Sequence, residues 1–247
     1  MTRGAIHIGT SGWHYDHWTG PFYPEGLAKD GRLDYYAERL SSVEINNTYY
    51  GTPEPETFGA WQSTVPKGFT FAVKASGYIT HRKKLKDPHE TVPPFYDAVK
   101  RLGDALGPVL YQLPPRWNVN LERLESFLQA LPDPGRTAFE FRDHSWIVED
   151  VRRLLTRFDA AFCVYQLSGF RSPTWVTSAS LVYARLHGPG DAYEGKYDRG
   201  SLLEWRDRIG EWADEGRDVF VFFDNDQSGY AVQNALELAE ALDSKPG

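Results

Sequence analysis

The feature that most constrains the fold is a regular alternation between short strand-like runs and longer helical ones. Eight short apolar runs are bounded by turn-forming residues, and nearly all of them are followed by a segment whose apolar residues recur at helical spacing. The expected strands span residues 5–9, 42–47, 69–75, 109–113, 139–142, 161–165, 181–187 and 218–223. The expected helices span residues 33–40, 54–64, 92–106, 121–131, 148–158, 201–215 and 230–242, with a doubtful short one within 166–180.

This alternation implies a parallel sheet with right-handed crossovers, and eight units in 247 residues match the size of a (β/α)8 barrel. We therefore predict an α/β fold, a TIM barrel with long βα loops at its C-terminal face, as one domain over residues 1–247. The alternative is an open, doubly wound sheet. It loses support because no Gly-x-Gly-x-x-Gly pattern follows the first expected strand.

The run Phe139-Glu140-Phe141-Arg142 illustrates how each strand divides into two faces. Successive side chains of a strand point to opposite sides, so the two phenylalanines share one face and the two charged residues share the other. In a TIM barrel the outer face packs on helices, and the active site lies at the carboxyl ends of the strands. Taking the polar face of every strand as the inner one gives His7, Ser11, Glu44, Asn46, Lys74, Ser76, Gln112, Glu140, Arg142, Tyr165, Arg185, His187 and Asn225.

The inner set holds one more cation than carboxylate, namely Lys74, Arg142 and Arg185 against Glu44 and Glu140. Buried charges are costly unless they are paired or bind a ligand. We favour a site in which the three cations clamp an anionic substrate, and in which Lys74 binds the anion rather than forming a Schiff base. The alternative is an internal network of ion pairs.

Glu44 and Glu140 are the candidate general acid and base, because carboxylates in different environments can divide these roles. They follow the second and fifth strands, so we expect a separation beyond the roughly 5–9.5 Å of glycosidases and rank glycoside hydrolysis low. His187 is a third catalytic candidate, as a base or as a hydrogen-bonding wall. Asn46 and Gln112 are candidate orienting groups for the substrate.

Many aromatic residues fall in the predicted loops, where rings beside a polar site can stack on sugars or exposed bases. We assign Trp13, Tyr49 and Trp146 to substrate binding, together with Asn225 after the last strand. The alternative is that most of the loop aromatics pack on one another over the barrel. A basic run at residues 82–86 could attract phosphates, although a solvated loop is the commoner explanation.

Composition limits the partners of the chain. A formal charge of −7 argues against broad electrostatic binding to nucleic acid or to an anionic membrane, but it is compatible with a local basic site. The single Cys163 excludes an internal disulfide. No signal-peptide core or bilayer-spanning run is present, so we expect a cytoplasmic protein without membrane association.

A divalent metal is possible but not favoured. Oxygen and imidazole ligands suit Mn, Zn or Mg, and Glu44, Glu140, His187 and Asp224 could provide them. However, the chain has no tight ligand spacing, and three nearby cations oppose a metal. We predict no metal ligands, and the sequence indicates neither a cofactor nor an oligomeric state.

A set of motifs resembles the YecE-like proteins, the family known as domain of unknown function 72. The motifs are IGTSGW at 8–13, FYP at 22–24, VEINNTYY at 43–50, FAVK at 71–74, TH at 80–81, LYQLPP at 110–115, FEFR at 139–142, SW at 145–146 and RLHG at 185–188. The resemblance covers nearly the whole chain in order. It implies a TIM barrel similar to that of xylose isomerases and endonuclease-IV-type enzymes, with no established activity. Two strand ends depart from the family pattern, at residues 165–166 and 223–225.

Three functional hypotheses follow. The first is an enzyme, preferably a phosphoester hydrolase, that acts on an anionic, phosphate-containing or nucleotide-like substrate. The second is a non-catalytic module that binds a nucleic acid or a metabolite. The third is a metal-dependent isomerase or lyase. A small anionic ligand is the expected partner, and nucleic acid is the alternative partner.

Overall fold

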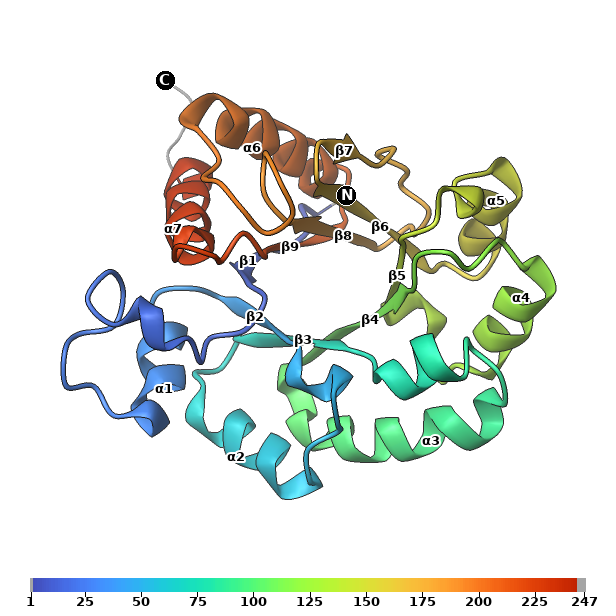
Figure 1. Ribbon diagram of the computed structural model, residues 1–247, viewed down its shortest axis with the longest axis horizontal. Helices are drawn as coiled ribbons and strands as arrows, with labels where there is room; N and C mark the ends of the chain where they lie inside the picture. Colours follow the sequence, from blue (N-terminus) through green and yellow to red (C-terminus); the bar gives the residue numbers. More distant parts are fainter. Residues whose placement is uncertain (1, 244–247) are drawn as a thin grey trace.

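The computed structural model describes residues 2–243, which form a ring of parallel strands surrounded by helices (Figure 1). The strand order is β1-β9-β8-β6-β5-β4-β3-β2, and the short β7 (Phe170–Arg171) pairs antiparallel with β6. The ring strands are β1 (Ile6–Thr10), β2 (Ser42–Ile45), β3 (Thr70–Lys74), β4 (Leu106–Leu113), β5 (Thr137–Phe141), β6 (Ala161–Leu167), β8 (Leu181–Leu186) and β9 (Asp218–Phe223).

The first two strands close the ring at their carboxyl ends. Ser11 forms a parallel bridge with Glu44, and the backbone N–H of Gly12 donates a hydrogen bond of 2.9 Å to the Glu44 carbonyl. The sheet therefore returns on itself with all ring strands parallel, and the predicted TIM barrel is confirmed.

The helices between the strands pack around the outside of the ring (Figure 1). They are α1 (Arg32–Ala37), α2 (Pro55–Thr64), α3 (Pro88–Val99), α4 (Leu121–Ala130), α5 (Glu149–Arg157), α6 (Arg199–Asp214) and α7 (Tyr230–Asp243). The side chain of Asn120 caps α4 by accepting a hydrogen bond of 2.9 Å from the backbone N–H of Arg123, as expected for this residue type. No helix of the described chain is long and apolar enough to cross a membrane.

Two segments differ from the sequence expectations. The helix expected at 92–106 begins earlier, at Pro88, because proline is well suited to the first turn of a helix, and it gives way to a 3-10 segment, Lys100–Ala105. The doubtful helix within 166–180 does not form. Ser168 and Gly169 both have positive φ, at 49° and 74°, and this turn sends the chain back beside β6 as β7.

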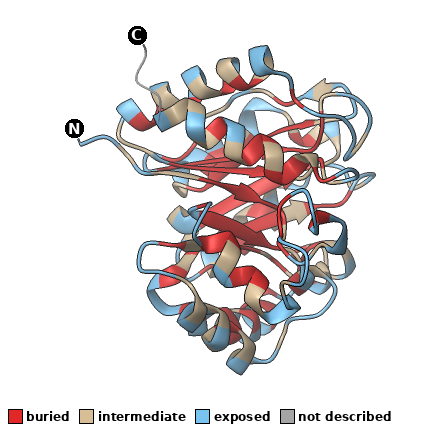
Figure 2. Cartoon of the chain, turned by 90° about the vertical axis from the view of Figure 1, so that its left-hand side faces the viewer, coloured by how far each residue is buried: buried red, intermediate tan, exposed pale blue. Residues whose placement is uncertain are grey.

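The interior of the barrel has an apolar layer beneath a polar one. Figure 2 shows the strands buried between the helices. The apolar layer combines small residues on one side with large ones on the other: Ala72, Leu110, Ala138, Ala161, Cys163, Leu181, Tyr183, Phe220 and Phe222. Two residues further along four of these strands stand Lys74, Glu140, Arg185 and Asp224. Because strand side chains repeat every two residues, these charged groups share the inner face at the carboxyl end.

Candidate active site

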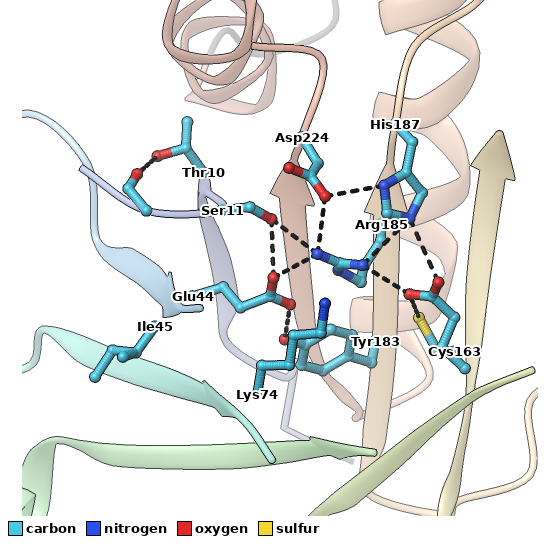
Figure 3. A network of polar contacts seen from close by, with 12 residues as sticks. Thr10, Ser11, Glu44, Ile45, Lys74, Cys163, Tyr183, Arg185, His187 and Asp224 are labelled. Carbon is cyan, nitrogen blue, oxygen red and sulfur yellow. Dashed lines mark hydrogen bonds and ion pairs between the residues drawn. The ribbon is translucent and has the colours of Figure 1, made fainter. Parts of the chain in front are cut away.

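Arg185, at the end of β8, is the centre of the polar layer. Its guanidinium is 1% exposed and binds three carboxylates from three other parts of the ring (Figure 3). Nη2 lies 2.7 Å from Glu44 Oε1 and 2.9 Å from Asp224 Oδ2, and Nη1 lies 2.9 Å from Glu140 Oε2. The planar guanidinium can serve several carboxylates at once because its donors point in fixed, divergent directions.

Glu44 is fully buried and its oxygens are occupied. Oε1 accepts hydrogen bonds from Ser11 at 2.8 Å and from Arg185 at 2.7 Å, and Oε2 accepts one from the Tyr183 hydroxyl at 2.6 Å. These contacts tie β1, β2 and β8 together inside the barrel. They favour a role for Glu44 in holding Arg185.

Glu140 is held between two arginines. Nε of Arg142 donates to Oε1 of Glu140, while Nη1 of Arg185 donates to Oε2. Burial alone would raise the pKa of Glu140, but the guanidinium groups of Arg142 and Arg185 outweigh it and hold this pKa well below its usual value. A carboxylate that stays ionised is a poor general acid, so this geometry favours Glu140 as an anchor for the arginines.

His187, just after β8, has a defined tautomer. Its Nε2 lies 3.1 Å from Nη2 of Arg142 and 3.3 Å from Nη1 of Arg185, and a guanidinium can only donate. Nε2 therefore accepts, and Nδ1 carries the proton that it donates to Asp224 Oδ2 at 3.0 Å. Asp224 orients the imidazole in this way, and the guanidinium and imidazole partners hold the pKa of Asp224 below its usual value against the effect of burial.

Lys74 differs from the other charged groups of the layer. Its amino group makes no hydrogen bond or ion pair with any residue that the structure describes, and it points toward the Arg185 network without a dashed contact in Figure 3. The amino group lies 4.8 Å from the centre of the Tyr49 ring. Burial and the nearby Arg185 lower the pKa of Lys74.

Arg142 has a free donor as well. Its side chain is 9% exposed; Nε binds Glu140, Nη2 binds His187, and Nη1 has no partner among the described residues. Nη1 of Arg142 and the amine of Lys74 are thus two cationic donors available to an anion.

His81 approaches the same tyrosine ring as Lys74. The short π-helix Tyr78–Arg82, in the loop after β3, carries it, and its ring meets the Tyr49 ring edge-on at 5.0 Å. Burial, then Lys74 and Arg142, lower the pKa of His81, so its imidazole is neutral near neutral pH. The Thr80 hydroxyl lies 2.9 Å from Nδ1 of His81.

Thr80 contacts one nitrogen of His81 and leaves the other without a partner among the described residues. The Thr80 hydroxyl donates to the Ser76 carbonyl at 3.2 Å, and a hydroxyl has one proton. In the tautomer where this proton goes to Ser76, Thr80 accepts from Nδ1–H of His81, and the lone pair of the imidazole is on Nε2. Nε2 has no partner among the described residues and can accept a proton.

The structure brings together most of the residues that the sequence assigned to the site. Around Arg185 and Lys74 lie Glu44, Tyr49, Glu140, Arg142 and His187. Gln112 is in register with Glu140 on the neighbouring strand. Asn46 follows Glu44 by two residues, and its buried Oδ1 has no hydrogen-bond partner. Substrate binding by Gln112 and Asn46 stays a prediction.

Three of the assigned residues lie elsewhere. Trp13 is buried in the outer core against Trp61 and Phe71. Trp146 is fully buried on the outer side, stacked on Phe141, with Nε1 donating to the Trp117 carbonyl at 2.6 Å. These two rings pack as core because their large apolar surface gains more from burial than from solvent contact.

The side chain of Asn225 also lies away from the candidate site, toward α7. Its Nδ2 donates to the Gly195 carbonyl at 2.8 Å and to Oδ1 of Asn234, on α7, at 3.0 Å. The preceding residue, Asp224, is the inward one at this strand end. The cluster accordingly holds three cations and three carboxylates and is formally neutral, so the expected excess of one positive charge is wrong.

The carboxylates are arranged for arginine rather than for a metal ion. Among residues 2–243 no three His, Cys, Asp or Glu side chains form a group that could hold one. Arg185 lies between Glu44, Glu140 and Asp224, where a shared cation would have to bind. This donor set does not fit a divalent metal.

The fold and the site define the class of the protein as a TIM barrel whose carboxyl end holds a buried ion-pair network around one arginine. The chain belongs to the family described as "Protein of unknown function DUF72", which matches residues 7–247. This membership confirms the family resemblance that the motifs indicated.

The similarity to relatives extends over nearly the whole chain. The UPF0759 protein YunF of Bacillus subtilis (strain 168) is 24% identical over 281 aligned positions, which cover 96% of this chain and 95% of YunF. A DUF72 family protein from Thermotoga maritima superimposes with a TM-score of 0.88 at 28% identity, covering 97% of this chain and 100% of the other. A second, from Enterococcus faecalis, has a TM-score of 0.81 at 20% identity, covering 99% and 100%, and it supports the fold alone.

Proposed function

We propose that the protein is an enzyme, a phosphoester hydrolase, that acts on an anionic, nucleotide-like substrate at the carboxyl end of the barrel. One observation carries this proposal: Lys74 and Arg142 each keep a cationic donor without a partner among the described residues, and Lys74 and His81 approach the same Tyr49 ring. Cations with free donors next to a neutral imidazole are the groups that hydrolysis of a phosphoester needs. The single Cys163 fits a reducing cytoplasm, where we propose that the enzyme acts.

The roles of the residues follow from their contacts. Lys74 and Nη1 of Arg142 bind the phosphoryl oxygens and stabilise the charge that develops on them. Nε2 of His81 accepts a proton from a water whose oxygen attacks phosphorus. The ester P–O bond breaks, and the leaving oxygen takes up a proton from the imidazolium that His81 has become. Glu44 and Glu140 hold Arg185 and Arg142 in place rather than transferring protons.

The test is an assay of the parent protein and of two variants on a panel of phosphomonoesters, phosphodiesters and nucleotides. His81→Gln is expected to lower kcat by about 100-fold or more, as for removal of a general base. Lys74→Met is expected to raise KM and to lower kcat, because it removes a cation that binds the phosphoryl oxygens and stabilises the charge that develops on them. His89→Gln, which changes an exposed histidine on α3, is the matched control and leaves both constants unchanged.

Two results would contradict the proposal. One is a parent protein without turnover on any member of the panel. The other is a His81→Gln variant that hydrolyses a substrate of the parent at the parental rate.

A non-catalytic binding module is the second candidate. The observation that favours it is the full occupation of the Glu44 and Glu140 oxygens, because paired carboxylates suit a rigid recognition site. In that case nucleotides bind to the parent with an affinity that Lys74→Met reduces, and no product forms at any enzyme concentration.

A further inference from the structure

A groove with a high density of cations lies on the same end of the barrel. It has a volume of about 690 Å³ and is formed by the loops after β3 and β4 and by the first turn of α4. Its lining consists of Tyr78, Arg82, Lys83, Lys84, Lys86, Asp87, Trp117, Asn120 and Arg123. None of these residues belongs to the Arg185 network. One wall is the basic run at 82–86, for which the sequence left open a phosphate-binding role and a solvated loop.

The charges of the groove are largely uncompensated. Its one carboxylate, Asp87, pairs with Lys83 at 2.7 Å. Arg82, Lys84, Lys86 and Arg123 form no ion pair with any residue from 2 to 243. Four cations without a carboxylate partner among the described residues, in a chain of net charge −7, create a local positive field that attracts polyanions.

The wall of the groove is anchored to the protein. Leu85 is fully buried, and its backbone N–H donates to the Ile79 carbonyl at 3.0 Å. The Arg123 guanidinium donates to the Lys84 carbonyl at 3.3 Å. Lys84 and Leu85 adopt positive φ values of 49° and 62°, which non-glycine residues hold only where their surroundings fix them. The cations are therefore presented from an ordered backbone.

Aromatic rings are interleaved with the cations. The Lys84 amine lies 5.9 Å from the centre of the Trp117 ring, and the Arg82 guanidinium lies 5.6 Å from that of Tyr78, which is 46% exposed. Sites for single-stranded nucleic acid combine these two features, with cations along the phosphates and rings that stack on bases. An acidic peptide would use the cations and leave the rings without partners.

We propose that this groove binds single-stranded nucleic acid, with phosphates on Arg82, Lys84, Lys86 and Arg123 and bases stacked on Tyr78 and Trp117. The inference rests on the proposed function and names its substrate class. One element serves both sites, because the π-helix Tyr78–Arg82 turns Tyr78 and Arg82 to the groove and His81 to Tyr49 and Lys74. A strand in the groove thus ends beside the candidate active site.

The experiment measures binding of a labelled oligothymidylate of about 12 nucleotides by fluorescence anisotropy over a range of salt concentrations. The double variant Arg82→Gln/Lys84→Gln is expected to bind at least about tenfold more weakly at low salt and to flatten the log–log salt slope by about 1.4, or 0.7 per lost phosphate contact. Tyr78→Ala is expected to weaken binding without changing the slope. Lys67→Gln/Arg101→Gln, which removes two exposed cations before β3 and β4, keeps the parental curve.

Several outcomes would contradict the proposal that the groove binds single-stranded nucleic acid. They are parental binding by Arg82→Gln/Lys84→Gln, equal binding of a duplex of the same length, or equal binding of an oligoglutamate of the same charge. The hydrolysis assay separates this inference from the proposed function. Binding of the oligonucleotide without any turnover would support the nucleic-acid groove and contradict the hydrolase. Turnover of small phosphoesters without oligonucleotide binding would contradict the groove alone.

Discussion

The Tyr183 hydroxyl donates a hydrogen bond of 2.6 Å to Oε2 of Glu44, and neither side chain reaches solvent. Tyr183 stands on β8 and Glu44 on β2, so this bond crosses the interior of the barrel. A buried carboxylate oxygen without a donor carries a large desolvation penalty. We predict that Tyr183→Phe lowers the free energy of unfolding by about 2 kcal/mol in denaturant melts.

The matched control is Tyr111→Phe. Tyr111 is another fully buried tyrosine, but its hydroxyl reaches only the Tyr96 hydroxyl, at 3.5 Å. This contact is long and uncharged, so we expect a loss below about 1 kcal/mol. Equal losses in the two variants would show that the charge on Glu44 adds nothing to its bond with Tyr183.

Glu140 gives the network a pH-dependent contribution to stability. Its pKa in the folded protein lies well below the ordinary glutamate value of 4.5, so the stabilisation is complete above that value and is lost as the pH falls through the folded pKa. Glu140→Gln removes this contribution. We predict that the variant is less stable than the parent by about 3–5 kcal/mol near neutral pH and that the gap narrows in acid.

Urea melts at a series of pH values measure this gap. Glu149→Gln is the control, because Glu149 also pairs with an arginine, Arg152, and has its pKa lowered to about 2, but lies at the surface. Solvent screens that pair, so we expect a much smaller gap. A gap for Glu140→Gln that does not change with pH would contradict the ionised state of Glu140 that we infer.

The fold and the centre of the site could be predicted because strands alternate between two faces. Glu44, Lys74, Glu140 and Arg185 each stand on a strand with clear polar and apolar sides, and all four lie inside the barrel. β9 offers no such contrast. From Val219 to Phe223 its residues are apolar on both faces, so the pattern gave no basis for choosing between Asp224 and Asn225.

The other differences between the predicted and the observed site arise in loops, where side chains follow no regular repeat along the sequence. His81 lies on a π-helical turn seven positions after Lys74, so strand alternation could not bring the two residues together. The Thr80–His81 motif was the one signal available. Trp146 was expected in the pocket and lies in the core instead. Whether a loop tryptophan reaches one or the other depends on packing against residues outside that loop, here Phe141 of β5 and Trp117 of the loop after β4.

Asp226, in the loop after β9, contacts the first loop of the barrel, and its ionised form destabilises the folded protein. It accepts a hydrogen bond of 2.7 Å from Nε1 of Trp18, and His17 approaches it at 3.0 Å. Burial, assisted by Asp224, raises the pKa of Asp226 to about 6. A raised pKa means that its stabilisation is complete below the unfolded value of 3.8 and is lost as the pH rises to about 6.

We therefore predict that Asp226→Asn is more stable than the parent above about pH 6, by about 1 kcal/mol once solvent screening is allowed for, and that this advantage disappears near pH 4. Thermal melts at the two pH values measure it. Asp198→Asn is a control of opposite sign, because the pKa of the Asp198 carboxylate is lowered by the N–H of Ser201 at the start of α6. An Asp226→Asn variant that is less stable at the higher pH would contradict the prediction.

Lys74 should differ from ordinary lysines in its reactivity. An amine acts as a nucleophile only when it is neutral, and the pKa of Lys74 is lowered by burial and by Arg185. The pKa of Lys83 is raised by its bond to Asp87, which makes Lys83 an internal reference. We predict that the rate of acetylation by a small reagent, followed by peptide mass spectrometry, reaches its plateau at a lower pH for Lys74 than for Lys83.

The pH of the plateau, unlike the absolute rate, does not depend on how easily the reagent reaches each lysine. Inorganic phosphate is expected to slow the acetylation of Lys74, because an anion bound there keeps the amine protonated. A plateau for Lys74 at the same pH as for Lys83 would contradict the lowered pKa of Lys74.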